Sequence, residues 1–115
     1  MSVVRHEPWG LGTDVVEAGG LVFTSGVVSE DNSLDMKGQT RDVLKQVDRL
    51  LALAGTDKSK IVSTTIWVTD IRNREAMNEV WKEWVDSNNL PARACVEAKL
   101  ADPLLLLEIM VVAAK

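Results

Sequence analysis

The chain has 115 residues, which is the size of one domain, because two separate cores would leave each half too small to bury enough surface. Its 46% hydrophobic and 26% charged residues are typical of a folded globular protein, and one cysteine excludes a disulfide framework. A formal charge of −4 has the wrong sign for holding phosphate backbones, so we expect no nucleic-acid partner.

The first residues lack the basic start and long apolar run of a secretory signal, so we expect a cytoplasmic protein with a reduced thiol. The longest apolar stretch, residues 104–114, is interrupted by Glu108. It is also shorter than the roughly 20 residues that span a bilayer. We therefore expect no membrane partner.

The first half of the chain contains a hairpin pattern followed by a helix pattern. Residues 14–18 and 21–28 are rich in β-branched side chains, and the glycine pair between them suits a tight turn, which predicts a β-hairpin. Apolar side chains then recur at helical spacing over residues 36–54, and Gly55 offers a C-terminal stop. This pattern predicts an amphipathic helix.

The second half reads as strand, helix and two further strands. Residues 61–68 are β-branched without a helical stripe, which favours a strand. A second helix is predicted to continue to Asn88-Asn89, and strands are predicted over residues 93–99 and 104–113. The apolar stripe of this helix consists of Met77, Val80, Trp81, Trp84 and Val85. The predicted order is ββαβαββ.

This order predicts an α+β fold with one mixed sheet and both helices on one face, because βαβ crossovers are right-handed. The last strand alternates apolar side chains on both of its faces. Two helices cover only one face, so we expect a second copy of the chain to bury the other. The alternative is an unusually apolar solvent-facing surface.

Several classes of chemistry lack the residues they need. His6 is the only histidine and lies near an expected mobile end, which excludes histidine triads and multi-histidine metal sites. Neither glycine-rich nucleotide fingerprint occurs. We therefore expect neither a metal nor a cofactor.

The remaining candidates lie near the end of the chain. Arg93, Cys95 and Glu97 share one face of a predicted strand by the two-residue period. Glu108 interrupts the most apolar strand, where an unpaired buried carboxylate would cost several kcal/mol. If the last two strands pair antiparallel, Arg93 and Glu108 lie near each other at one rim of the sheet, and this arrangement suits a substrate that carries a carboxylate.

Each candidate also has a simpler interpretation. Arg93 and Glu108 could form a salt bridge without a ligand. Cys95 could be a plain core residue, and Glu97 a solvated or ion-paired side chain. The tryptophans Trp67, Trp81 and Trp84 suit core and interface positions better than stacking platforms.

The segment Pro91-Ala92-Arg93-Ala94-Cys95-Val96-Glu97-Ala98, with Leu100, Pro103 and Glu108-Ile109, resembles the signature of the reactive intermediate/imine deaminase (Rid, YjgF-type) family. The resemblance runs in unbroken order along the chain. Further matches are Thr24-Ser25-Gly26, Gln39-Thr40, Ala54-Gly55, Val68-Thr69-Asp70, Ala76-Met77-Asn78 and Trp81.

The resemblance implies a single Rid/YjgF-type domain over residues 1–115, with a chorismate-mutase-like fold assembled as a homotrimer and active sites between subunits. It implies hydrolysis of reactive enamines and imines, such as 2-aminoacrylate, to 2-keto acids and ammonia. By position, Arg93 would hold the substrate carboxylate and Glu108 would position or activate the attacking water. Ser25, Asn78 and the backbone around Cys95 would line the pocket.

One position departs from the family pattern. Deaminases of the best-known subgroup carry a tyrosine ahead of the first hairpin strand, whereas this chain has no tyrosine and places Gly12 there. The pocket is then more open or is filled from elsewhere. A non-catalytic trimer that binds small carboxylic acids or acts as a chaperone is the alternative function, and an endoribonuclease is less favoured because the chain is acidic.

Overall fold

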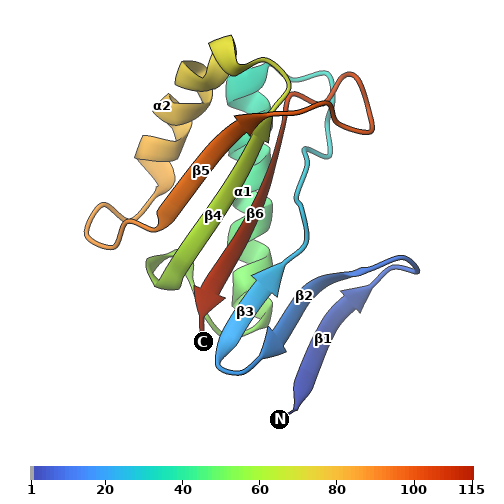
Figure 1. Cartoon of the computed structure of the whole chain (residues 1–115), viewed down its shortest axis with the longest axis vertical. Helices are drawn as coiled ribbons and strands as arrows, with labels where there is room; N and C mark the ends of the chain where they lie inside the picture. Colours follow the sequence, from blue (N-terminus) through green and yellow to red (C-terminus); the bar gives the residue numbers. More distant parts are fainter. Residues whose placement is uncertain (1) are drawn as a thin grey trace.

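A computed structural model describes residues 2–115 as one six-stranded sheet with two α-helices (Figure 1). In chain order the strands and helices are β1 (Val3–Pro8), β2 (Thr13–Ala18), β3 (Leu21–Thr24), α1 (Met36–Leu53), β4 (Ile61–Val68), α2 (Arg74–Trp84), β5 (Ala92–Glu97) and β6 (Leu107–Ala114). Short 3-10 turns, Lys58–Lys60 and Ile71–Asn73, precede β4 and α2.

The strands lie in the order β1-β2-β3-β6-β4-β5. Only β4 and β5 run parallel, as a βαβ crossover through α2 requires, and the other neighbours are antiparallel. The predicted mixed sheet is confirmed. The expected pairing of the last two strands is wrong, because β6, the most apolar strand, takes a central position and leaves β4 between itself and β5.

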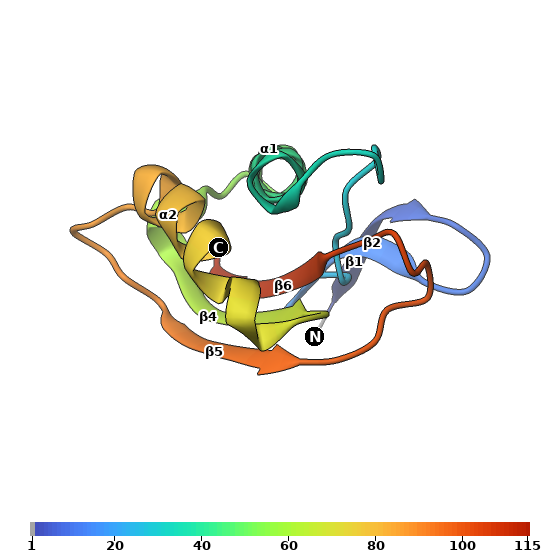
Figure 2. The same ribbon diagram turned by 90° about the horizontal axis from the view of Figure 1, so that it is seen from above.

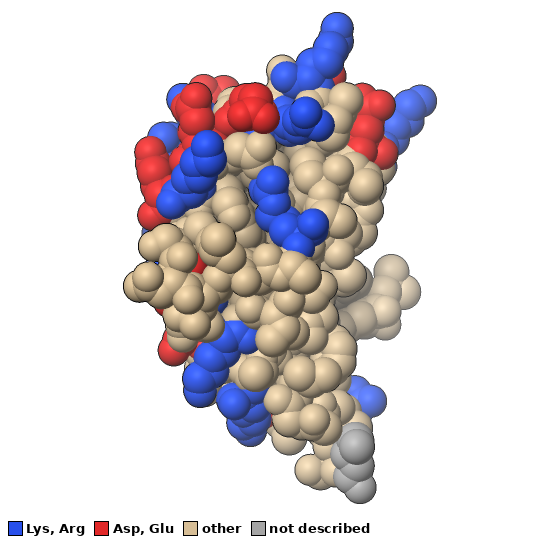
Figure 3. Space-filling view, turned by 60° about the vertical axis from the view of Figure 1, so that its left-hand side comes forward, with Lys and Arg blue, Asp and Glu red and all other residues tan. Residues whose placement is uncertain are grey.

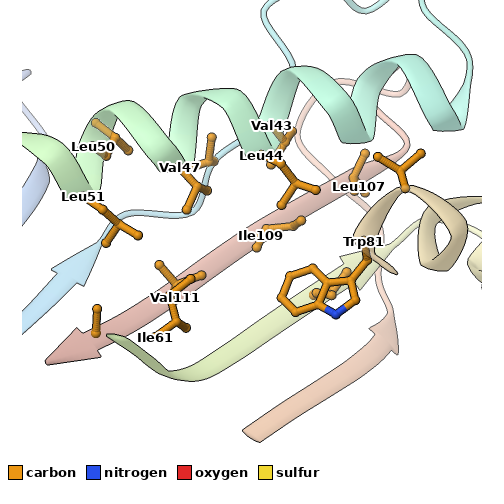
Figure 4. Close-up of a cluster of buried hydrophobic side chains, with 14 of the residues drawn as sticks. Val43, Leu44, Val47, Leu50, Leu51, Ile61, Trp81, Leu107, Ile109 and Val111 are labelled. Atoms are coloured by element: carbon orange, nitrogen blue, oxygen red, sulfur yellow. The ribbon is translucent and has the colours of Figure 1, made fainter. Parts of the chain in front are cut away.

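Both helices cover the same face of the sheet, and the opposite face is bare (Figure 2). Beneath α1 the buried side chains of β6 meet the apolar stripe of the helix (Figure 4). Leu44, Leu51 and Ile109 are among the largest fully buried residues there, and burying each contributes about 1.5–3 kcal/mol. The predicted arrangement of helices is confirmed.

The predicted tight turn, the glycine stop and the strand over residues 61–68 are confirmed, because each depends on only a few neighbouring residues. Gly19 and Gly20 both have positive φ, as the tight turn between β2 and β3 requires. The Asp35 carboxylate accepts a hydrogen bond from the Gly38 N–H at the start of α1, and Gly55 has a φ of 74° just after its end. The predicted strand over residues 61–68 is β4.

Four predicted elements end or begin short of expectation. The strand predicted over residues 21–28 ends at Thr24, and the strand predicted over residues 93–99 ends at Glu97. The second helix and the last strand are shorter because side chains bind the backbone. α2 ends at Trp84, and Asp86 then accepts the Asn88 N–H in a turn. β6 begins at Leu107 because the buried amide of Gln39 accepts the Leu106 N–H at 2.9 Å and donates to the Leu104 carbonyl at 3.1 Å. These hydrogen bonds satisfy the backbone groups of Leu104 and Leu106, which were predicted to pair with a neighbouring strand.

One strand was not predicted. β1 pairs with β2 along the edge of the sheet, and it includes His6, which lies in an ordered strand and not at a mobile end. The His6 ring lies 2.6 Å from the Glu17 carboxylate on β2, and the Lys115 ammonium contacts the same carboxylate. The histidine therefore ties the edge strand to its neighbour.

The bare face of the sheet, which we call the open face, is apolar. It lies opposite the helices, and its side chains alternate with the buried ones along each strand. Its large apolar members are Val16, Leu21, Phe23, Trp67, Val96, Met110 and Val112. The uncovered apolar face is thus confirmed, and its burial by a second copy stays a prediction. Neither helix in residues 2–115 has the length and hydropathy to cross a bilayer.

Candidate functional site

Arg93 lies on the edge strand β5, and α2 fixes its guanidinium. One terminal nitrogen, Nη1, donates to the Asn78 Oδ1 at 2.8 Å, and the guanidinium carbon lies 5.5 Å from the centre of the Trp81 ring. A cation over an aromatic face contributes about 0.5–1 kcal/mol at an exposed site. Arg93 remains exposed, and most of its five N–H donors stay free for a ligand.

A hollow of about 280 Å³ lies beside this guanidinium. Its lining residues are Asn78, Trp81, Lys82, Val85, Leu90 and Arg93. Figure 3 shows a face on which basic side chains lie on a largely uncharged middle part, while acidic side chains gather toward the top. Two cations beside apolar walls suit a small carboxylate with an apolar substituent.

Arg93, Cys95 and Glu97 share one face of β5, as predicted, because they lie opposite Thr64, Ile66 and Val68 of β4. This is the face beneath the helices, since those three β4 residues are buried. Cys95 packs against the core, and burial raises the pKa of its thiol.

The Glu97 carboxylate accepts the Ile71 N–H at 3.3 Å. Cys95 and Glu97 therefore hold structural contacts beside Arg93.

Glu108 lies on β6 and projects from the open face. Its carboxylate is so close to Gly26 that a Cβ at that glycine would lie 2.1 Å from Oε2. Within residues 2–115 the carboxylate has no hydrogen bond or ion pair, although Glu108 is half-buried. Gly26 thus provides the space that Glu108 occupies.

Ser25 precedes Gly26, and its backbone is fixed on both sides. Its N–H donates to the Asp14 carbonyl at 2.9 Å, and its carbonyl accepts the Thr24 hydroxyl at 2.9 Å. Ser25 and Glu108 are therefore brought to the same region through Gly26, as Arg93 and Asn78 are on the other side of the sheet.

Arg93 and Glu108 do not meet within one chain, which corrects the expected arrangement at one rim. Arg93 lies opposite Thr64, and Glu108 lies opposite Trp67, an odd number of residues further along β4. Successive residues of a strand point to opposite faces, so the two side chains leave the sheet on opposite sides. A ligand-free Arg93–Glu108 salt bridge within the chain is excluded by the same geometry.

Trp81 was expected to be a core residue, and it is buried, but it also supports the Arg93 guanidinium. Asn78 and Trp81 are three residues apart, so they share one face of α2. The three-residue spacing of Asn78 and Trp81 was the feature of the sequence that could have identified the helix surface in contact with Arg93. The constraint at Gly26 had no local signal, because it arises from contact with a distant strand.

The protein is an α+β domain that has one mixed sheet, both helices on one face of that sheet, and an exposed arginine on the edge strand. Residues 7–115 match the family model described as "Endoribonuclease L-PSP". A RutC family protein from Haemophilus ducreyi is 39% identical over 102 residues, which cover 89% of this chain and 87% of that protein.

Two solved structures are also similar to the chain. A YjgF family protein from Neisseria meningitidis has a TM-score of 0.97 and 40% identity, covering 100% of this chain and 96% of that one. A Rid family protein from Yersinia pestis has a TM-score of 0.90 and 30% identity, covering 99% of this chain and 100% of that one. The chain therefore belongs to the YjgF/Rid family.

Proposed function

We propose that the protein hydrolyses reactive enamines and imines to 2-keto acids and ammonia without a cofactor. The observation that carries this proposal is the Arg93 guanidinium, which Asn78 and Trp81 hold at the rim of a small, partly apolar hollow. Guanidinium groups bind carboxylates with two parallel hydrogen bonds, and 2-imino acids carry such a carboxylate.

The proposed site requires two copies of the chain, because Arg93 and Glu108 leave one sheet on opposite sides. The apolar open face supplies a reason for assembly, since a contiguous apolar surface of this kind is a common mark of an interface. We infer a homotrimer in which Arg93 of one copy faces Ser25 and Glu108 of its neighbour. Closed cyclic assemblies use one such contact repeatedly.

The proposed reaction balances without an oxidant or reductant. An enamine substrate first gains a proton on its methylene carbon and loses one from nitrogen to become the imine. A water oxygen then adds to the C=N carbon, Glu108 accepts the proton that the water loses, and the nitrogen takes up a proton from solvent to give a tetrahedral amino alcohol. Glu108 then returns its proton to the amino nitrogen, the hydroxyl proton passes to solvent as the C=O bond forms, and the C–N bond breaks to release ammonia. Positioned acid–base assistance contributes about 10²–10⁴-fold to such steps.

The test compares the wild type with Arg93→Ala on 2-aminoacrylate that a dehydratase generates in the assay. A charge-assisted hydrogen bond contributes about 1.5–3 kcal/mol, so we expect kcat/KM to fall roughly 10- to 150-fold. Arg72→Ala is the matched control. Arg72 is also exposed, and it pairs with Asp70 in the connection between β4 and α2. Keto acid that appears no faster with the wild type than with Arg93→Ala contradicts the proposal.

The same assay separates catalysis from simple binding. If calorimetry detects 2-ketobutyrate bound through Arg93 while no imine is turned over, the protein is a carboxylic-acid-binding or chaperone-like assembly. The family description also names endoribonuclease activity. A formal charge of −4 opposes RNA binding. An affinity for RNA that falls steeply with salt concentration would support the endoribonuclease activity instead.

A further inference from the structure

The loop that joins β1 to β2 holds an exposed tryptophan in a fixed position. This Trp9 loop consists of residues 9–12, in which the Trp9 N–H donates to the Gly12 carbonyl at 2.9 Å. Gly10 has a φ of 94°, a left-handed conformation that glycine adopts without strain. Although this hydrogen bond closes the loop, the Trp9 residue remains 54% exposed.

Gly12 has no side chain because the Trp9 ring occupies that space. A Cβ at Gly12 would lie 2.8 Å from the indole Cζ2 and 3.3 Å from two further ring atoms. The backbone does not require glycine there, since Gly12 is absent from the residues with positive φ, in contrast to Gly10. Gly12 therefore serves to seat the indole.

Charged groups attach the Trp9 loop to the helix layer. Glu7 has a φ of 58°, rare for a residue other than glycine, and its carboxylate forms two hydrogen bonds with the Arg49 guanidinium of α1 at 2.8 and 3.1 Å. Burial and the neighbouring Glu7 raise the pKa of Asp14, and the nearby Trp9 side chain opposes this rise. The indole thus packs against Gly12 and lies near the Asp14 carboxylate.

Asp14 connects the tryptophan to the candidate site. Its carbonyl accepts the Ser25 N–H, and it lines a hollow of about 350 Å³ together with Ser25 and Gly26. Gly26 in turn lies against the Glu108 carboxylate. The exposed Trp9 ring therefore lies near Asp14, which borders the part of the candidate site that carries Ser25 and Glu108.

We propose that Trp9 is a specificity-determining residue whose indole forms an apolar wall of the site and favours 2-imino acids with flat, aromatic side chains. This inference rests on the proposed function. A ring that already packs against Gly12 contacts a ligand at a lower cost in conformational entropy than a free side chain. Contact between two aromatic rings contributes about 0.5–1.5 kcal/mol beyond burial, and this corresponds to roughly 2- to 12-fold in kcat/KM.

The test measures the ratio of kcat/KM for two imines that an amino-acid oxidase generates from phenylalanine and from alanine. We expect Trp9→Ala to lower this ratio about 10-fold through a higher KM for the aromatic imine, with kcat unchanged. Trp9→Phe keeps most of the ratio. Leu11→Ala is the matched control, because Leu11 is 95% exposed in the same loop and should leave the ratio unchanged.

A second variant displaces the indole without removing it. Gly12→Ala should lower the ratio as Trp9→Ala does, and the double variant should lower it no further, because both changes act on one ring. An unchanged ratio in Trp9→Ala overturns the inference. A lower sedimentation mass of that variant also overturns it, since Trp9 would then be an interface residue.

Calorimetry distinguishes failure of this inference from failure of the proposed function. If the wild type hydrolyses neither imine, the proposed function is wrong, and the affinities for phenylpyruvate and pyruvate then test Trp9 alone. Weaker binding of phenylpyruvate only, in both Trp9→Ala and Gly12→Ala, supports the wall. Equal affinities in the wild type and both variants overturn it.

Discussion

The two faces of the sheet carry different halves of the candidate site, and the halves differ in how complete they are. On the covered face, Arg93 has a hydrogen-bond partner in Asn78 and an aromatic support in Trp81. On the open face, Glu108 is half-buried beside Gly26, and no group within residues 2–115 pairs with it. The chain alone arranges the binding cation, whereas the carboxylate lies on the surface that a second copy would cover.

The largest expected effect comes from a charge on the open face. Phe23→Asp should abolish assembly and lower imine hydrolysis by more than about 100-fold, because a carboxylate buried in an apolar interface costs several kcal/mol. Sedimentation mass and the rate of keto-acid formation measure the two effects.

Leu53→Asp is the matched control for that change. Leu53 on α1 and Phe23 are both 39% exposed, but Leu53 lies on the helix side. We expect its variant to keep the mass and activity of the wild type. Equal loss of assembly in both variants would show that the open face has no special role.

A smaller effect is expected at Gly26, because a change there disturbs Glu108 and leaves Arg93 in place. Gly26→Ala places a methyl group where the Glu108 carboxylate lies, so the flexible end of Glu108 must move while the strand remains. We expect kcat to fall about 100-fold, as loss of positioned acid–base assistance does. The affinity for 2-ketobutyrate, which Arg93 provides, should stay within about twofold by calorimetry.

Glu108→Gln provides the comparison for Gly26→Ala. It removes the same proton acceptor without adding volume, so the two variants should lose similar amounts of kcat. A full rate in Gly26→Ala, with unchanged thermal stability, would remove Glu108 from the reaction.

The smallest effect concerns Cys95, which lies beside Arg93 on the covered face. Burial raises the pKa of its thiol, so little thiolate exists near pH 7, and Cys95→Ala should keep activity within about twofold. Alkylation by iodoacetamide should accelerate as pH rises toward the raised pKa.

The Arg93 charge opposes the rise in the pKa of Cys95. Arg93→Ala should therefore raise this pKa further and slow alkylation at a fixed pH below it, because the thiolate fraction falls. Mass spectrometry of the alkylated protein measures the rate. Faster alkylation in Arg93→Ala would contradict the nearness of the two side chains.

The elements that local pattern determines could be predicted from the sequence. The helix over residues 36–54 and the strand over residues 61–68 follow from periodicity, β-branching and the glycine stop, which act over a few residues. The shared face of Arg93, Cys95 and Glu97 follows from the strand period alone.

Features set by distant contacts could not be predicted. The insertion of β6 between β3 and β4 depends on strand pairing across the whole chain, and it decides that Arg93 and Glu108 leave opposite faces. The late start of β6 depends on the Gln39 side chain, 65 or more residues away in the sequence. Residue types suggested the candidate site, while the sheet order decided how its parts are distributed.

The most direct test of the shared site mixes two inactive variants. Arg93→Ala and Glu108→Gln chains are each assayed alone and then after unfolding and refolding together in equal amounts. If Arg93 of one copy serves Glu108 of its neighbour, random assembly gives one intact site in four, and about a quarter of the wild-type rate should return. A mixture that forms mixed assemblies by native mass spectrometry yet remains as inactive as its components would contradict a site shared between copies.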